Sequence, residues 1–259
     1  NFDFINSIST KKDEYNLKKI IAVNINAFSR FIFSKNINEY SFLEFKVYIL
    51  IKCILGDEII NIKNKFEKIF QNQVDDFAMH KSYNIFEQAK CINNIDEIIS
   101  ILLNFDKNVP ETFYLTKLRM ETILAQYFHK DNSLALFNGV SNNNVEKIKH
   151  TLNDKQNIRK IQFPDHCTGI FFFEDKEKKI FLDAVQPTSS FHSKKLSAGT
   201  LSLEFSSGKE KIITNCGALE KSTGNAAYLR YSAAHSTIIL ENTNISEIRD
   251  NQPHIKYPQ

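Results

Sequence analysis

The stretch Thr200-Leu201-Ser202-Leu203-Glu204-Phe205 alternates apolar and polar side chains. An alternation with a period of two residues is typical of a β-strand that has one apolar and one polar face. The pattern predicts a sheet in which the leucines and the phenylalanine pack on a core while Ser202 and Glu204 lie on a wet face.

Further segments with strand character lie on both sides of this stretch. Turn signals separate them, such as Glu174-Asp175-Lys176 and Ser207-Gly208. The region after about Ile161 is therefore predicted to be a β-domain. Its other expected strands are Gly169–Phe173, Lys179–Leu182, Ile212–Thr214 and Ser236–Leu240.

The region from Leu17 to about Phe128 has helical periodicity instead. It predicts several antiparallel helices with short connections. Because helices precede strands and do not alternate with them, the fold class is α+β with more than one domain. The three apolar stripes are Leu17, Ile20, Ile21, Phe28 and Phe31; Ile92, Ile95, Ile99 and Leu102; and Phe113, Met120, Leu124 and Tyr127, with Lys117 among them.

The boundary between the two halves is expected after Asn138-Gly139, which breaks the helical pattern. We predict a helical domain over residues 1–140, a linker over 141–160 and a β-domain over 161–259. The apolar stretch from Ser41 to Leu55 reads as a core helix, because it is too short and too charged to span a bilayer.

Composition excludes several classes of protein. The 259 residues include 33 basic and 30 acidic side chains without charge blocks, which argues against a general nucleic-acid binder. The hydrophobic fraction of 42% excludes a disordered chain. The 4 cysteines form no C-x-x-C pair, so they are expected to be buried small hydrophobes and to form neither a zinc ribbon nor a redox motif.

Several separated motifs resemble one family. The block Ser197-Ala198-Gly199-Thr200-Leu201-Ser202-Leu203-Glu204-Phe205, then Asn215-Cys216-Gly217, then Arg230 followed by Ala233-Ala234-His235-Ser236-Thr237-Ile238, resembles the C-terminal domain of heparinase II/III-like proteins. There the pattern is an L-S-F-E strand, a D/N-x-G turn and an R…A-H-[NS]-T strand. In the helical half, residues 75–84 are similar to the D-G…H-x-S-x-N segment of a bacterial branch, and residues 129–139 to a recurring end of its helical domain.

The resemblance implies an N-terminal incomplete α/α toroid followed by an antiparallel β-sandwich, with a substrate cleft between them. Family sandwiches are larger than the region after residue 160, so we expect the natural protein to continue beyond both ends of this sequence. The first residue is Asn1, which leaves secretion undecided and keeps a periplasmic or cell-envelope location open.

The activity implied by the resemblance is cleavage of uronate-containing polysaccharides by β-elimination, so an acidic polysaccharide or oligosaccharide is the expected partner. This reaction needs a donor for the carboxylate, a base at the neighbouring carbon and an acid for the leaving oxygen. The catalytic candidates are His80, Tyr83, Asn84 and His235.

Each candidate also has a structural interpretation. If a helix begins near His80, this residue, Tyr83 and Asn84 share one face; alternatively Ser82 is the helix N-cap and His80 is a loop residue. Asp75 and Asp76 either orient His80 or are solvated loop acids. His235 is either a cleft residue or a half-buried strand histidine.

Three basic residues are candidates for substrate binding. Arg230 is a carboxylate-binding or a structural cation, and Lys194 and Lys195 either bind a uronate or sulfate or are solvated turn residues.

No metal or other cofactor is predicted. The better-studied lyases of the family hold a metal with two histidines and an aspartate, and the corresponding positions here are Ser197, Asn215 and His235. Serine and asparagine are poor zinc ligands, so a structural zinc of that type is not expected. A shifted register that uses His192 is the alternative.

These observations leave two main functional hypotheses. The first is a polysaccharide lyase, and the second is a catalytically degenerate, glycan-binding or envelope-associated relative. A sugar hydrolase is a weaker third, because it needs paired carboxylates that flank the scissile bond, and the acids near His80 are Asp75, Asp76 and Glu87.

Overall fold

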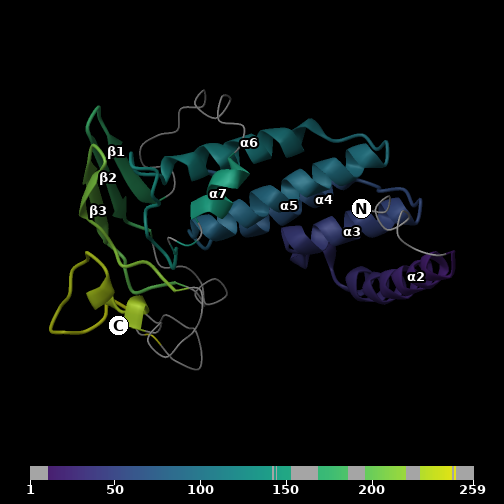
Figure 1. Ribbon diagram of the computed structural model, residues 1–259, viewed down its shortest axis with the longest axis horizontal. Helices are drawn as coiled ribbons and strands as arrows, with labels where there is room; N and C mark the ends of the chain where they lie inside the picture. The colour runs from purple at the N-terminus through teal and green to yellow at the C-terminus, as the bar shows by residue number, and fades with distance from the viewer. Residues whose placement is uncertain are drawn as a thin grey trace. The chain divides into compact units, whose positions relative to one another are not determined.

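The computed structural model describes residues 11–141, 143, 145–152, 169–185, 196–219, 228–246 and 248. Within these residues, helices precede an antiparallel sheet, which confirms the α+β class (Figure 1). The helices are α2 (Lys11–Ser34), α3 (Phe42–Ile54), α4 (Ile62–Gln73), α5 (Ile85–Asn104), α6 (Glu111–Gln126) and α7 (Val145–Thr151), with 3-10 turns η1 (Ile37–Glu39) and η5 (Ser232–Ala234). The strands are β1 (Ile170–Glu174), β2 (Lys178–Asp183), β3 (Leu203–Ser207) and β4 (Glu210–Ile213).

The chain divides into two compact units. The first comprises Asn1–Asn72 and Glu97–Val109, and the second comprises Gln73–Asp96 and Pro110–Gln259. Helix α5 contributes to both units, whereas α6, α7 and the sheet belong to the second. The division into domains at 1–140 and 161–259 stays a prediction, and α7 lies inside the segment that we expected to be a linker.

Aromatic side chains form the core of the first unit. Helix α3 is the predicted core helix, and it begins at a capping box in which Ser41 and Glu44 each accept the other's backbone N–H. Phe42 and Phe45 of α3 contact Phe66 of α4 with ring centroids 5.9 and 6.4 Å apart.

The helix predicted first in the chain is present, but the described residues of its apolar stripe are not buried. Ile20, Phe28 and Phe31 of α2 are 57%, 57% and 61% exposed. The stripes of α5 and α6 are confirmed as core, since Ile92, Ile95, Phe113 and Met120 are all buried. No helix in the described residues is long and apolar enough to span a membrane.

The sheet has the strand order β1-β2-β3-β4, and every neighbouring pair is antiparallel. Figure 1 shows β1, β2 and β3 side by side. Both predicted turns are confirmed: Asp175 Oδ1 accepts the Lys178 N–H at 2.6 Å between β1 and β2, and Gly208 has a φ of 56° between β3 and β4.

The prediction that the polar face of the sheet is exposed to solvent is wrong, because this face is buried. Ser202, Glu204 and Ser206 are 1%, 0% and 1% exposed, whereas Leu201 is 46% exposed. The segment that follows α6 packs on this polar face: the Tyr127 ring lies 5.2 Å from Phe172, and the His129 ring 4.8 Å from Phe181. Glu204 and Ser206 can be buried because this segment supplies hydrogen-bond partners for their side chains.

The strand predicted over Ser236–Leu240 is also wrong. The segment is irregular apart from one isolated bridge between Leu240 and Thr243. Here hydrogen bonds that involve side chains take the place of bonds between two strand backbones. Ser236 N donates to Asn215 Oδ1 at 2.9 Å, and Thr237 Oγ1 donates to the Thr200 carbonyl at 2.5 Å. Such side-chain bonds to the backbone compete with sheet formation.

The cysteines only partly follow the prediction. Cys53 and Cys91 are buried free thiols, and burial raises the pKa of Cys91 to about 12. Cys216 is exposed, so the prediction is wrong for it, and Cys167 lies outside the described residues.

Candidate functional site

Three of the predicted site residues lie in one turn before α5. Tyr83 N donates to the His80 carbonyl at 2.7 Å, and Tyr83 has a φ of 51°. Because α5 begins only at Ile85, the expectation that His80, Tyr83 and Asn84 share a helix face is wrong. They share a tight turn instead.

Asn84 caps α5, so the alternative in which Ser82 is the N-cap is wrong. Its Oδ1 accepts the N–H groups of Phe86 at 2.8 Å and Glu87 at 3.2 Å, as an N-cap side chain does. Its Nδ2 donates to the Asn138 carbonyl at 2.7 Å, and Asn138 Nδ2 donates to the Tyr83 carbonyl at 3.3 Å. The Asn138-Gly139 turn is thereby joined to the turn before α5.

His80 is buried, and its ring is held by Ser82. Its Nδ1 accepts the Ser82 N–H at 3.2 Å and lies 2.7 Å from Ser82 Oγ. Since Nδ1 acts as an acceptor, the neutral ring carries its proton on Nε2. The arrangement therefore favours His80 as a hydrogen-bond donor through Nε2 over a base that acts through Nδ1.

Tyr83 has a phenol that resists ionisation. Burial raises its pKa, and the carboxyl groups of Asp75 and Asp183 raise it further. Burial also raises the pKa of Asp75, although its Oδ1 accepts the N–H groups of Phe77 and Met79 at 3.0 and 2.8 Å. At neutral pH the phenol thus remains a proton donor.

Asp183 is a site residue that the sequence reasoning missed. It ends β2 and is only 3% exposed. Its carboxyl accepts the Val185 N–H at 3.0 Å and interacts with the Asn138 side-chain amide. Burial outweighs these donors and raises the pKa of Asp183 to about 7. The available signal was an acid placed directly after the apolar residues Ile180-Phe181-Leu182.

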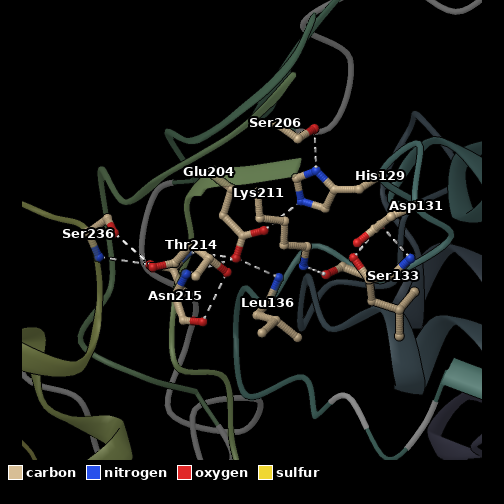
Figure 2. A network of polar contacts seen from close by, with 11 residues as sticks. His129, Asp131, Ser133, Leu136, Glu204, Ser206, Lys211, Thr214, Asn215 and Ser236 are labelled. Atoms are coloured by element: carbon tan, nitrogen blue, oxygen red, sulfur yellow. Dashed lines mark hydrogen bonds and ion pairs between the residues drawn. The ribbon is translucent and has the colours of Figure 1, made fainter. Parts of the chain in front are cut away.

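A second polar cluster is centred on Glu204 (Figure 2). Glu204 Oε1 accepts the backbone N–H groups of Leu136 at 3.0 Å and Asn215 at 3.1 Å, and the Asn215 amide at 3.2 Å. Glu204 Oε2 lies 2.8 Å from His129 Nε2, and His129 Nδ1 lies 2.8 Å from Ser206 Oγ. This cluster attaches the segment after α6 to the sheet.

His235 lies directly after η5 and next to Ser236, whose backbone N–H donates to Asn215 of the Glu204 cluster at 2.9 Å. It is 9% exposed, and an added Cβ on Gly199 would lie 3.2 Å from its Cγ, so the ring is seated on the glycine. Burial lowers its pKa, against the opposing effects of the Leu229 backbone and Glu204. Among the described residues, its Nε2 is enclosed and has no hydrogen-bond partner.

The predicted binding residues are only partly described. Arg230 Nε donates to the Leu196 carbonyl at 3.0 Å, and the Arg230 carbonyl accepts the Ala198 N–H at 2.8 Å. These contacts fit the interpretation of Arg230 as a structural cation. Lys194, Lys195 and the alternative ligand His192 lie outside the described residues.

The positions that correspond to the family metal site do not fit a zinc ion. Asn215 uses Oδ1 to accept the Ser236 N–H and Nδ2 to donate to Glu204, so its amide is already committed. Ser197 is buried and His235 supplies a single imidazole. Among the residues that the structure describes, no three His, Cys, Asp or Glu side chains form a group able to hold a metal ion.

Comparison with known proteins finds one matching family model and several solved structures with a similar fold. Residues 161–255 match the family model described as Heparinase II/III-like, C-terminal. The fold is similar to that of heparan sulfate lyase HepC from Pedobacter heparinus, with a TM-score of 0.57 and 16% identity over 79% of this chain and 37% of that chain. It is also similar to a heparinase III, the BT4657 gene product, with a TM-score of 0.58 and 14% identity over 79% of this chain and 37% of that chain.

The chain therefore spans 37% of the length of these two solved structures. A search of curated protein sequences finds no significant match. The match over residues 161–255 and the shared fold agree with the motifs noted in the sequence. Residues 161–255 therefore match the C-terminal domain of the heparinase II/III-like family, and the fold of the chain is similar to that of two proteins named as a heparan sulfate lyase and a heparinase III.

Proposed function

We propose that this chain forms part of a polysaccharide lyase that cleaves an acidic, uronate-containing glycan by β-elimination. The observation that carries the proposal is the turn before α5, in which Tyr83 lies beside His80 and Asn84 and its phenol is kept protonated. The proposal also draws on the names of similar structures, which are a heparan sulfate lyase and a heparinase III.

The reaction requires that a weakly acidic proton leave the carbon beside a carboxylate. A base takes this proton, the bond between the adjacent carbon and the glycosidic oxygen breaks, a carbon-carbon double bond forms, and an acid protonates the leaving oxygen. Tyr83 suits the last task, since burial and the neighbouring carboxyl groups raise its pKa and keep the phenol protonated.

The substrate carboxylate needs hydrogen-bond donors, because the charge on the conjugated unit grows as the proton leaves. His80 offers Nε2–H when its ring is neutral, as the contact of Nδ1 with Ser82 requires. Asn84 has two amide protons, and one of them donates to Asn138. In the proposal the second amide proton, together with the cations Arg230, Lys194 and Lys195, binds the carboxylate.

The proposed base is His235. Burial lowers its pKa, so the ring is neutral near pH 7 and has a nitrogen free of a proton that can accept one. Its Nε2 is enclosed among the described residues, and proton abstraction therefore requires a movement that exposes this nitrogen.

A second candidate function is glycan binding without turnover. Three observations favour it: Nδ1 of His80 is occupied by Ser82, Asn84 caps α5, and Nε2 of His235 is enclosed. A degenerate relative would keep the donors for a carboxylate and lack an accessible base.

The test is incubation of the protein with a panel of uronate polymers, including heparan sulfate, while the ultraviolet absorbance of the unsaturated product is followed. Tyr83→Phe removes the phenolic proton and keeps the ring, so we expect kcat to fall by roughly a hundredfold or more with little change in binding. Tyr114→Phe on α6 is the matched control, because Tyr114 is 45% exposed.

The outcomes separate the two candidates. New absorbance that depends on Tyr83 supports the lyase. Binding to an acidic glycan without any new absorbance supports the non-catalytic relative and rejects the lyase. If the protein neither binds nor cleaves any polymer of the panel, both proposals are wrong.

A further inference from the structure

Three residues with an unusual backbone conformation surround the end of β2. Tyr83, Asn138 and Leu201 have φ values of 51°, 51° and 62°, in the left-handed region that non-glycine residues rarely occupy. Such conformations persist only where surrounding contacts hold them. The residues come from three segments that are far apart in the sequence, so a shared contact is needed to explain why they lie together.

Asp183 supplies that shared contact. Its carbonyl accepts the Leu201 N–H at 2.7 Å, and its own N–H donates to the Ser202 carbonyl at 2.9 Å. Its carboxyl interacts with the Asn138 amide, and Asn138 Nδ2 donates to the Tyr83 carbonyl at 3.3 Å. Asp183 is thus linked to Leu201 directly and to Tyr83 through one side chain.

We propose that Asp183 is a positioning residue of the candidate site, which holds the turn with Tyr83 and Asn84 against the sheet through Asn138. This inference rests on the proposed function of that turn. Asn138 provides the connection because its side chain contacts both Asp183 and Tyr83, while its carbonyl accepts the Asn84 amide at 2.7 Å.

The charge state of Asp183 changes near neutral pH, so the proposal predicts an effect that depends on pH and can be measured. Burial raises the pKa of this carboxyl to about 7. Tyr83 is the titratable group that faces it, and Asp75 in turn faces Tyr83. An ionised carboxylate accepts the Asn138 amide more strongly than a neutral one, so the hold on the turn tightens as Asp183 loses its proton.

A purely structural role is the competing explanation. Asp183 Oδ1 accepts the Val185 N–H at 3.0 Å, and a residue that only closes this turn would affect stability alone. Asp183→Asn separates the two roles, since an asparagine oxygen can still accept the Val185 N–H but no longer titrates. Asp96→Asn is the matched control, because Asp96 has a 54% exposed side chain on α5.

The first measurement does not require any activity. The side-chain amide resonances of Asn138 and Asn84 are followed by NMR from about pH 5 to about pH 9. In the unsubstituted protein and in Asp96→Asn, the Asn138 amide is expected to titrate with a midpoint near 7, and in Asp183→Asn this titration is lost. An Asn138 amide that does not titrate in the unsubstituted protein overturns the proposal, whether or not the protein binds glycans.

The second measurement is the affinity for heparan sulfate oligosaccharides, and KM and kcat where turnover is found. We expect Asp183→Asn to lose roughly tenfold in affinity or kcat/KM, with a changed pH profile and a fold that remains cooperative. An unchanged pH profile, with only a lower melting temperature, assigns Asp183 a structural role and contradicts the proposal. If the unsubstituted protein binds no glycan, the proposed function fails, and the NMR result still decides whether Asp183 holds the turn.

Discussion

His129 Nε2 lies 2.8 Å from Glu204 Oε2, and both side chains are completely buried. Glu204 comes from β3, whereas His129 follows α6, so the contact fastens the sheet to the end of the helical segment (Figure 2). A buried carboxylate is tolerated only when donors satisfy it, and Glu204 has the N–H groups of Leu136 and Asn215 in addition to the imidazole.

Glu204 is the first target for substitution. Glu204→Leu leaves several buried donors without an acceptor, and we expect it to lower the free energy of unfolding by about 3 to 5 kcal/mol. Glu204→Gln keeps one carbonyl oxygen for the N–H groups and places an amide beside His129, so we expect a smaller loss of about 1 to 2 kcal/mol. Urea unfolding measures both.

The control for these variants is Glu210→Gln, because Glu210 is an exposed glutamate on β4. It is expected to change the free energy of unfolding by less than about 0.5 kcal/mol. Equal stability of Glu204→Leu and the unsubstituted protein would contradict the role of Glu204 as a buried acceptor.

Asn215 provides a second prediction. Its Nδ2 donates to Glu204 at 3.2 Å, so Asn215→Asp replaces a donor by a second buried carboxylate. Like charges raise the pKa of the new acid, and the variant therefore binds a proton more readily when folded than when unfolded. We expect a loss of about 2 to 4 kcal/mol near pH 8 that shrinks as the pH falls toward 5.

Urea unfolding at both pH values checks the Asn215 prediction, with Asn143→Asp as the exposed control. A loss that is independent of pH would mean that the two carboxyl groups do not interact.

The linkage of Asp183 to folding gives a third prediction. Burial raises its folded pKa to about 7 from 3.8, so this group favours the folded state at low pH. That contribution is fully present below about pH 4 and is lost as the pH rises through 7. Relative to the unsubstituted protein, Asp183→Asn is therefore expected to become more stable with increasing pH, by roughly 2 to 4 kcal/mol between pH 4 and pH 8.

The Asp183 prediction is checked by unfolding both proteins across this pH range. A stability difference that stays constant with pH, or that grows in the opposite direction, would contradict a raised pKa for Asp183.

Two glycines allow backbone strain to be separated from a steric clash. Gly217 has a φ of 72°, and an added Cβ would lie 2.8 Å from the Val140 carbonyl oxygen; Gly56 has a φ of 71°, and nothing lies within 4 Å of its added Cβ. We expect Gly56→Ala to lower the free energy of unfolding by about 1 to 2 kcal/mol through backbone strain. Gly217→Ala is expected to lower it by roughly 1 kcal/mol more at least, because the added Cβ meets a backbone atom that cannot easily move away. Melting temperatures of the two variants measure the difference, and equal values would contradict it.

The local structure was largely readable in advance. The core helix α3 and the buried stripe of α5 follow from residue types and spacing within one helix. Hairpin turns were also predictable, because Gly208 and Asp175 act on their own neighbours. The candidate site was predicted only in part, since the sequence brought His80, Tyr83 and Asn84 together in one short segment but on a helix face, and gave no indication of Asp183.

By itself the sequence determined the order of helices and strands, the positions of most turns and the resemblance to one family, since these depend on short-range pattern and local motifs. Only the tertiary structure decided which face of the sheet is covered. Alternation along β3 shows that its two faces differ, but a polar side chain is buried wherever a distant segment brings hydrogen-bond partners to it. His129 and Leu136 bring them to Glu204, and Asn138 to Asp183, from parts of the chain that the strand pattern does not include.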